Sequence, residues 1–493
     1  MDLDYDLQSI QEVRNLIAQA VKAEKILAGF SQEKLDTICE AIADACADHA
    51  EELAEMAVSE TGFGRWEDKV LKNKLGSTMT WESVRNLKVI GVLKEDKQKK
   101  VEEIGVPVGV VAALIPSTNP TSTVMYKSII SIKAGNAIVL SPHPGAKKCI
   151  METYRVIRKA AEQAGAPEGT ITCVSIITAQ ATEALLKHPD IGVILATGGE
   201  AMVHAAYSSG NPALGVGPGN GPSFIEHTAD IPSAIRRIMD SKTFDNGTIC
   251  ASEQSIVTER CIAENVEEEL IKQGGCFLTE EQTEQLSGLL LRSNGTMNPA
   301  IVGKTALQIA AMAKICVPDG TRLLLVRQKA TGISRKNPFA REKLCPILAY
   351  FVAEGWEDAC DICISLLSNE GAGHTMTLHT ENREVVQAFA MKKPVSRILV
   401  NTPGALGGVG ATTGLAPALT LGCGAVGGSA TSDNITPNHL INIRRVAYGL
   451  CELEDLRTEN ATENEEFGRA QEHLSEAEIE AITRAVMERL KVR

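Results

Sequence analysis

The sequence predicts an α/β protein built around a doubly wound parallel sheet. From Val106 onward, short apolar runs alternate with amphipathic stretches of helical length. Strands separated by such helices are joined by right-handed crossovers and form a parallel sheet covered on both faces. A chain of 493 residues has room for two or three domains, and a second alternating series starts near Asn220. We therefore predict a nucleotide-binding domain over residues 1–219 and a second α/β domain over residues 220–425.

The predicted elements follow the apolar periodicity in chain order. Residues 8–88 carry apolar side chains at helical spacing and are predicted to be helices. The predicted strands of the first series are 109–115, 137–140, 171–176 and 192–196, and its predicted helices are 123–134, 146–164, 179–186 and 200–208. The strand candidates of the second series are 222–225, 254–257, 322–326 and 347–352.

Composition and charge exclude several classes of protein. The 49 basic and 62 acidic residues give a formal net charge of −13, which disfavours binding to nucleic acid and to anionic lipid. No apolar run approaches the roughly 18 residues that a membrane helix needs, and the acidic N-terminus is unlike a secretory signal. The 13 Cys and nine His form no ligand-spaced set. We expect a cytoplasmic protein without membrane, nucleic-acid or metal binding.

Three charged segments are predicted to lie outside the two α/β domains. Residues 93–103 form an exposed hairpin, as either a solvated loop or an oligomerisation arm. Residues 452–472 are rich in acids, have few apolar groups and are predicted to be a linker. Residues 473–493 form an amphipathic helix capped by Ser475 and Glu478, with one apolar stripe. That helix either folds back on the body, pairs with a second copy, or docks into a groove of a partner.

Cys250 is the candidate nucleophile, although its spacing alone does not distinguish it from the other cysteines. It lies in the segment SKTFDNGTICASEQSIV, in a glycine-bearing loop between a predicted helix and the strand at 254–257. Free backbone N–H groups in such a loop would stabilise a thiolate and the oxyanion formed on a carbonyl. Burial statistics alone favour a structural role for any one of 13 cysteines.

Five ordered segments carry a family resemblance that covers residues 10–450. They are TFDNGTICASEQSIV, IPSTNPTSTVMYKSIISIKAGNAIVLSPHPGAKK, LATGGEAMVHAAYSSGNPALGVGPGN, EKLCPILAY and TSDNITPNHLINIRRVAYG. Together they resemble the CoA-acylating aldehyde dehydrogenases of ethanolamine- and propanediol-utilising bacterial microcompartments. The resemblance implies an aldehyde dehydrogenase-like fold, with a Rossmann-type cofactor domain (1–219) and an α/β catalytic domain (220–425). It also implies a β oligomerisation arm, built from residues 92–104 and 426–451, in a homodimer or tetramer.

The resemblance assigns roles to individual residues. Cys250 becomes the nucleophile and Asn119 the side-chain donor to the oxyanion, while His374, in a glycine-rich turn, is a candidate for handling the proton of coenzyme A. Glu342 matches the carboxylate that hydrogen-bonds the nicotinamide ribose. The other implied NAD-binding residues are Pro116, Ser117, Ser141, His143, Thr197, Gly198 and Gly199. The stretch GVGPGNG lacks GxGxxG spacing, so its glycines are predicted to permit close backbone packing.

A missing carboxylate indicates the fate of the thioester. Hydrolytic aldehyde dehydrogenases carry a Glu in a LELGGK-like stretch, whereas the matching residues 213–222 here read ALGVGPGNGP. Coenzyme A, a better nucleophile than water, can take the acyl group without that base. We expect a short aliphatic aldehyde (propionaldehyde or acetaldehyde), NAD and CoA to give acyl-CoA and NADH.

Two alternatives to that function stay open. One is a hydrolytic NAD(P)-dependent aldehyde dehydrogenase, and the other is a non-catalytic scaffold or redox-sensing protein. The helix at 473–493 resembles encapsulation peptides, which implies shell proteins as partners and a place inside a microcompartment.

Overall fold

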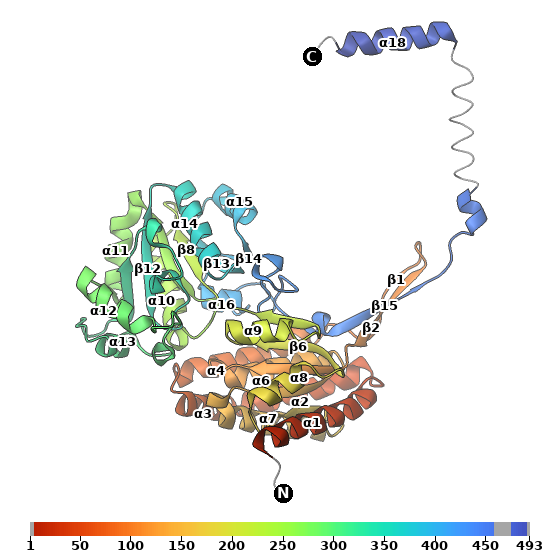
Figure 1. Cartoon of the computed structure of the whole chain (residues 1–493), viewed down its shortest axis with the longest axis horizontal. Helices are drawn as coiled ribbons and strands as arrows, with labels where there is room; N and C mark the ends of the chain where they lie inside the picture. Colours follow the sequence, from red (N-terminus) through yellow and green to blue (C-terminus); the bar gives the residue numbers. More distant parts are fainter. Residues whose placement is uncertain (1–3, 458–474, 491–493) are drawn as a thin grey trace. The chain divides into compact units, whose positions relative to one another are not determined.

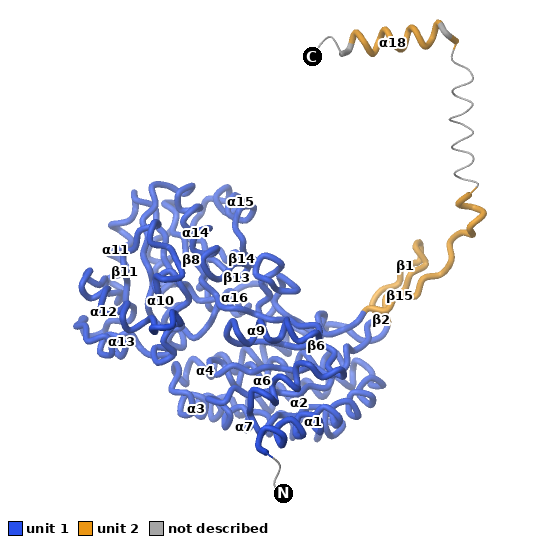
Figure 2. Tube along the Cα trace, viewed as in Figure 1, with its two compact units in different colours: residues 1–91, 105–442 blue, residues 92–104, 443–493 orange. Residues whose placement is uncertain are grey.

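The computed structural model describes residues 4–457 and 475–490. The chain divides into two compact units, which are coloured separately in Figure 2. The first unit comprises Met1–Gly91 and Gly105–Asn442, and the second comprises Val92–Ile104 and Ile443–Arg493.

The N-terminal segment of the first unit is helical, as predicted (Figure 1). Ser31 caps the second helix by accepting a hydrogen bond from the backbone N–H of Lys34 at 3.3 Å. The helices are α1 (Tyr5–Leu27), α2 (Gln32–Asp48), α3 (Ala50–Thr61), α4 (Trp66–Lys74), a π-helical turn (Leu75–Met79) and α5 (Thr80–Val84).

A five-stranded sheet of order β5-β4-β3-β6-β7 follows, and all its strand pairs are parallel. Its strands are β3 (Val110–Ile115), β4 (Ala137–Pro142), β5 (Ile171–Cys173), β6 (Ile191–Thr197) and β7 (Ala213–Val216). The helices between and after them are α6 (Pro120–Lys133), α7 (Lys147–Gln163), α8 (Ala179–Leu186) and α9 (Glu200–Tyr207). Alternate residues of β3 pack into separate cores, Val111 with α2, α6 and α7, and Val110 with α1 and α8. Both faces are therefore covered, which confirms the doubly wound prediction.

A seven-stranded parallel sheet of order β10-β11-β12-β9-β8-β13-β14 forms the rest of the first unit. Its strands are β8 (Gly221–Ile225), β9 (Glu253–Glu259), β10 (Gly275–Phe277), β11 (Leu323–Arg327), β12 (Ile347–Ala353), β13 (Gly373–His379) and β14 (Val395–Val400). One face packs on α10 (Ile231–Thr243) and α11 (Ala263–Lys272). The other packs on α12 (Glu280–Leu290), α13 (Ala306–Met312), α14 (Trp356–Asn369) and α15 (Arg383–Lys392), and α16 (Gly404–Gly408) follows β14. The four predicted strands are present, whereas β10, β13 and β14 were not predicted.

The second unit contains a three-stranded sheet of order β1-β2-β15. The predicted hairpin is present as β1 (Gly91–Asp96) and β2 (Val101–Pro107), and β15 (Ile441–Ala447) joins it from the far end of the sequence. Pairing continues past β15, because the backbone N–H of Tyr448 donates to the carbonyl of Lys100 at 3.1 Å.

The C-terminal helix α18 (Glu476–Leu490) is also described within the second unit. The backbone N–H of Ser475 donates to the Glu478 carboxylate at 2.9 Å, which is one half of the predicted capping box. Ile479, Ile482 and Val486 are each about half exposed. The start of the predicted linker differs from the prediction, because residues 453–457 are helical. Residues 458–474, which hold most of the predicted linker, and residues 491–493 lie outside the described part of the chain.

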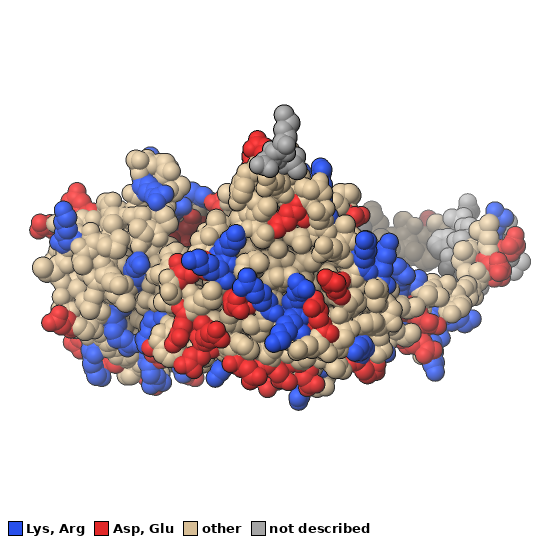
Figure 3. All heavy atoms as spheres, turned by 90° about the horizontal axis from the view of Figure 1, so that it is seen from below, with Lys and Arg blue, Asp and Glu red and all other residues tan. Residues whose placement is uncertain are grey.

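The surface carries charges of both signs. On the face drawn in Figure 3, acidic and basic side chains lie side by side. Several form exposed pairs within one helix, such as Arg158 with Glu162 at 2.7 Å, and each such pair adds little stability. None of the described helices combines the length and the apolar character needed to cross a membrane.

Candidate active site

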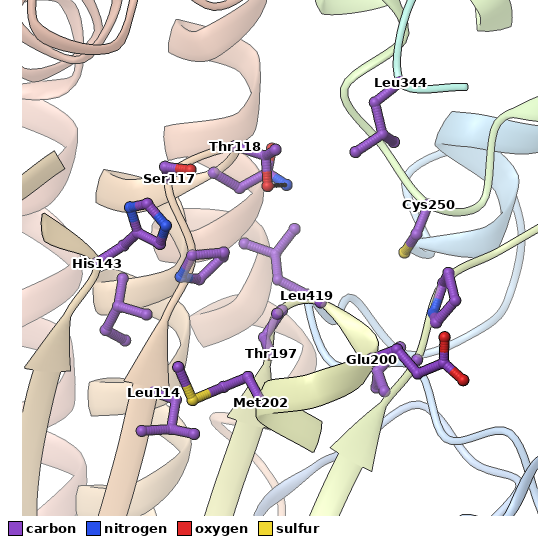
Figure 4. Close-up of a pocket in the computed structure, with 18 of the residues that line it drawn as sticks. Leu114, Ser117, Thr118, His143, Thr197, Glu200, Met202, Cys250, Leu344 and Leu419 are labelled. Carbon is purple, nitrogen blue, oxygen red and sulfur yellow. Dashed lines mark hydrogen bonds between the residues drawn. The ribbon is translucent and has the colours of Figure 1, made fainter. Parts of the chain in front are cut away.

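A cavity of about 560 Å³ lies at the carboxyl ends of the strands of the five-stranded sheet, where parallel α/β sheets bind their ligands. The turns after β3, β4 and β6 line one side, and the loop before β9 lines the other. The sulfur of Cys250 points into this cavity, and Ser117, Thr118 and His143 face it from the opposite side (Figure 4). The two sheets of the first unit thus contribute to one site.

Cys250 lies between a short 3₁₀ turn (Phe244–Gly247) and β9, and it is partly exposed. Burial raises the pKa of its thiol to about 12, the nearby Glu342 carboxylate acts in the same direction, and Arg397 opposes them. In this structure the thiol is therefore protonated at neutral pH.

The loop between β7 and β8 packs directly on the backbone of Cys250. A Cβ added at Gly219 would lie 2.0 Å from the carbonyl oxygen of Cys250 and 3.4 Å from Cε1 of His374. At Gly221 an added Cβ would lie 2.7 Å from the carbonyl oxygen of Thr375. The prediction that the glycines of GVGPGNG permit close backbone packing is confirmed at Gly219 and Gly221 but not at Gly217, where an added Cβ would meet no atom within 4 Å.

Glu342 faces the cavity from the loop that precedes β12. Its Oε1 accepts a hydrogen bond from the backbone N–H of Gly219 at 2.9 Å. Burial raises the pKa of this carboxyl group to about 8. Glu342 therefore lines the cavity and at the same time holds the glycine loop that packs on the backbone of Cys250.

Asn119 lines the cavity at the start of α6, a helix whose residues are all buried. Its side chain makes no capping bond to that helix. Instead, Oδ1 accepts a hydrogen bond from Nζ of Lys72 at 2.6 Å, and Nδ2 donates to the hydroxyl of Thr118 at 3.3 Å. The buried helix fixes the backbone of the turn, and the buried lysine fixes the side chain.

Lys69, Lys72 and Asp245 form a buried ionic cluster beside the site, which the sequence analysis missed. Oδ2 of Asp245 pairs with Nζ of Lys72 and, at 2.9 Å, with Nζ of Lys69. Burial alone would raise the pKa of Asp245, but the two ammonium groups outweigh it and hold that pKa below its usual value. Burial lowers the pKa of Lys72 to about 8. The only signal in the sequence was the spacing of two lysines by one helical turn.

The residues implied for dinucleotide binding lie together. All eight line the cavity: Pro116, Ser117, Ser141, His143, Thr197, Gly198, Gly199 and Glu342. Gly199 precedes α9, as predicted, and no side chain caps that helix. The backbone N–H of Met202 donates to the carbonyl of Gly199 at 3.0 Å, and those of Glu200 and Ala201 remain available for an anionic group such as a phosphate.

His374 is placed differently from the prediction. It lies on β13 rather than in a turn, because the polar run GHTMTLH pairs in parallel with β8 and β14 and is buried between them. Its side chain does not line the cavity but lies beside Gly219, where an added Cβ would be 3.4 Å from Cε1 of His374. Burial lowers the pKa of His374 to about 3, so the ring is neutral, with Nδ1 3.0 Å from the hydroxyl of Thr375.

One group of side chains within residues 4–457 and 475–490 has the composition of a metal site. It comprises Glu226, His227 and Glu259, at the carboxyl ends of β8 and β9, whereas Cys250 precedes the amino end of β9. Nδ1 of His227 lies 2.9 Å from Glu226 Oε1 and 2.7 Å from Glu259 Oε2. The hydrogen bond to Glu259 raises the pKa of His227, which favours the protonated ring beside the two carboxylates.

Comparison with curated proteins and solved structures places this geometry among known enzymes. The chain is 43% identical over 444 residues to the bifunctional aldehyde-alcohol dehydrogenase AdhE of Escherichia coli (strain K12), covering 89% of this chain and 50% of that protein. The chain thus spans half the length of this relative. It is 36% identical to the succinate-semialdehyde dehydrogenase (acetylating) of Clostridium kluyveri, covering 88% of this chain and 95% of that protein.

Solved structures share both the fold and the sequence. A probable aldehyde dehydrogenase from Listeria monocytogenes is 60% identical, with a TM-score of 0.91 over 92% of this chain and 100% of that one. A propionaldehyde dehydrogenase from the Clostridium phytofermentans fucose utilisation bacterial microcompartment is 28% identical, with a TM-score of 0.81 over 89% of this chain and 98% of that one. The Rhodopseudomonas palustris propionaldehyde dehydrogenase is 27% identical, with a TM-score of 0.80 over 88% of this chain and 97% of that one. It was solved with bound CoA and an acylated cysteine.

The family assignment rests on more than half of the sequence. The sequence model of the aldehyde dehydrogenase family matches residues 4–287, a range that includes Asn119, Cys250 and the whole five-stranded sheet. This chain matches only half of AdhE, but it covers almost all of the C. kluyveri relative. Together with the cavity that faces Cys250, these matches show that the chain belongs to the aldehyde dehydrogenase family.

Proposed function

We propose that this protein is a CoA-acylating aldehyde dehydrogenase that converts a short aliphatic aldehyde, NAD and CoA to acyl-CoA and NADH. One observation carries the proposal: Cys250 points into a cavity whose adjoining loop, residues 213–222, contains no carboxylate. A relative that is named acetylating, and a neighbour solved with CoA and an acylated cysteine, support it.

The first half of the proposed reaction takes place on Cys250. Its sulfur adds to the aldehyde carbonyl as the thiol proton leaves to water, which gives a hemithioacetal oxyanion. Nδ2 of Asn119 and the backbone N–H of Cys250 stabilise that oxyanion. A dinucleotide held by the cavity residues would supply the hydride acceptor. Loss of hydride from the hemithioacetal carbon leaves a thioester on the sulfur of Cys250.

The second half transfers the acyl group from Cys250 to a thiol. A water molecule would need a base to attack the thioester, and the segment that supplies it in hydrolytic enzymes is uncharged here. The thiol of CoA ionises more readily, attacks the thioester carbon and releases the Cys250 sulfur. We propose His374 as a candidate for handling the thiol proton at this step, because its buried Nε2 has no hydrogen-bond partner among the described residues and a Cβ at Gly219 would lie 3.4 Å from its ring.

The cavity fits a dinucleotide and a small aldehyde. The uncapped N-terminus of α9 suits a phosphate, and Glu342, which lines the same cavity, would accept a hydrogen bond from the nicotinamide ribose. Val409, Leu419 and Leu421 supply apolar lining, which favours a short alkyl chain over a charged one.

Cys250→Ala tests the nucleophile, and omission of CoA tests the acceptor. We expect Cys250→Ala to abolish NADH formation while dinucleotide binding persists. In the wild type without CoA, NADH should form for a single turnover and then stop. Continued NADH production with release of free carboxylic acid would instead indicate a hydrolytic enzyme. Full turnover by Cys250→Ala would exclude Cys250 as the nucleophile.

We further propose a cofactor domain at 1–219, a catalytic domain at 220–425 and an oligomerisation arm from 92–104 and 426–451. The exposed strand β15, with Ile443 and Val446 partly uncovered, supports an arm that makes a homodimer or tetramer. Light scattering is the direct measurement, and a monomer mass near 52.7 kDa would contradict it.

The exposed apolar side chains of α18 support a role for residues 473–493 as an encapsulation peptide, which would place the enzyme inside a bacterial microcompartment in the cytoplasm. Deletion of residues 457–493 should leave the enzyme active but unable to associate with shells, and fusion of this segment to a fluorescent protein should recruit the fusion. A fusion that stays diffuse beside assembled shells would contradict this role.

A further inference from the structure

The ammonium group of Lys72 lies between the two loops that carry the proposed oxyanion donors. From α4 it donates to Oδ1 of Asn119 at 2.6 Å, and it also contacts the hydroxyl and the carbonyl oxygen of Thr248 at 3.1 and 3.2 Å. Thr248 precedes Cys250 by two residues. We propose that Lys72 is a positioning residue that orients and polarises the Asn119 amide for the oxyanion. This inference rests on the proposed function.

Lys72 determines which end of the Asn119 amide faces the cavity. An ammonium group has three N–H donors and no acceptor, so only the amide oxygen can approach it to 2.6 Å. A flipped amide would place two donors against each other, and both would lose a partner inside the protein. The NH₂ group is thereby directed away from Lys72. Among the described residues, its one hydrogen bond is the long one, 3.3 Å, to the hydroxyl of Thr118, which an oxyanion can replace.

The positive charge also strengthens the amide as a donor. Withdrawal of electron density from Oδ1 increases the positive charge on the amide hydrogens, and the effect is large where water is excluded. The side chain of Lys72 is only 2% exposed. The ionisable groups around it are Asp245 from the turn before Cys250, and Lys69 and Asp68 from its own helix. Asp245 pairs with the ammonium and keeps it charged inside the protein.

Lys69 provides a matched comparison for Lys72. It lies one helical turn earlier on α4, is equally buried, and pairs with the same oxygen of Asp245. Its other bond goes to the backbone carbonyl of Thr118 at 3.0 Å and not to the Asn119 side chain. Loss of Lys69 therefore perturbs the same ionic cluster and leaves the amide contact in place.

The test is a double-mutant cycle on the first turnover. We would measure the rate of the NADH burst without CoA, at saturating aldehyde and NAD, in Lys72→Met, Asn119→Ala and the double variant. Asn119→Ala should slow the burst by about 10²-fold to 10³-fold, as for one oxyanion donor. Lys72→Met should slow the burst by a large part of that factor in the wild-type background and cause little further loss in the Asn119→Ala background. Lys69→Met should change the burst by the same factor in both backgrounds.

Two further measurements separate positioning from misfolding. The KM for NAD and the thermal midpoint should change far less than the burst rate in Lys72→Met, because Asp245 keeps Lys69 as its partner. If Lys72→Met does not fold, Lys72→Gln replaces it in the same cycle. The inference would be overturned if the Lys72 substitution slowed the burst by the same factor in the wild-type and Asn119→Ala backgrounds. It would also be overturned if the Lys72 variant showed a burst at the wild-type rate. Failure of the proposed function is distinct, because it would appear as turnover in Cys250→Ala or as turnover without CoA.

Discussion

Gly219→Ala is the substitution whose effect follows most directly from the structure. The added Cβ would lie 2.0 Å from the carbonyl oxygen of Cys250, whereas real Cβ atoms essentially never come within 3.0 Å of another heavy atom. The two backbones must therefore separate by at least 1 Å, the difference between these distances. A displacement of that size at a reacting group costs about 10²-fold in rate, or about 2.7 kcal/mol of transition-state stabilisation. The same shift would weaken the bond from the Gly219 N–H to Glu342.

The assay for Gly219→Ala compares the rate of the NADH burst with the rate of Cys250 alkylation by iodoacetamide. Gly217→Ala is the control in the same loop, because a Cβ at Gly217 meets no atom within 4 Å. We expect the Gly217→Ala control to keep the wild-type melting temperature and the wild-type rate of Cys250 alkylation. The reasoning is refuted if Gly219→Ala forms NADH as fast as the wild type, or if both variants lose the same activity.

Three more predictions follow from the ionisable groups near the site. Because burial raises the pKa of Cys250 to about 12, iodoacetamide should alkylate the ligand-free enzyme at neutral pH more slowly than it alkylates free cysteine, and the rate should rise with alkaline pH. Between pH 4.5 and about 8, Glu342 is protonated in the folded state but ionised in the unfolded state, so this residue makes stability fall as pH rises. Glu342→Gln should therefore flatten the fall in thermal midpoint across that range, and an unchanged slope would contradict the assignment. Asp245→Asn leaves two buried ammonium groups without a carboxylate and should lower the free energy of unfolding by about 3–5 kcal/mol in urea titrations.

The sequence predicted those elements whose burial is visible as uninterrupted apolar character. Strands β3 and β4 are buried on both faces by helices, and their residues are correspondingly apolar. Strand β13 is as fully buried but reads GHTMTLH, with polar side chains at alternate positions, so His374 was wrongly placed in a turn. Strand β10 has only three residues, too few for a periodic pattern.

Within the site, the sequence led to Cys250, Asn119 and the cavity residues only through family resemblance, because none of them has distinctive spacing. No local sequence pattern could predict the ionic cluster of Lys69, Lys72 and Asp245. Asp245 meets Lys69 and Lys72 across more than 170 residues of chain, and lysines on an amphipathic helix are normally solvated. Only the tertiary fold shows that these two lysines face inward.

The close contact between the β7–β8 loop and Cys250 also constrains how the substrate range can change. Behind the cavity-lining residues Val216, Gly217 and Pro218, atoms added at Gly219 and Gly221 would collide with the backbone of Cys250 or Thr375. Substitutions there cannot enlarge or reshape the aldehyde pocket without displacing the nucleophile. The adjustable part of the lining consists instead of apolar side chains, among them Val409, Leu419 and Leu421. We therefore expect variation that adapts this enzyme to bulkier aldehydes, whether natural or directed, at such side chains and not at these two glycines.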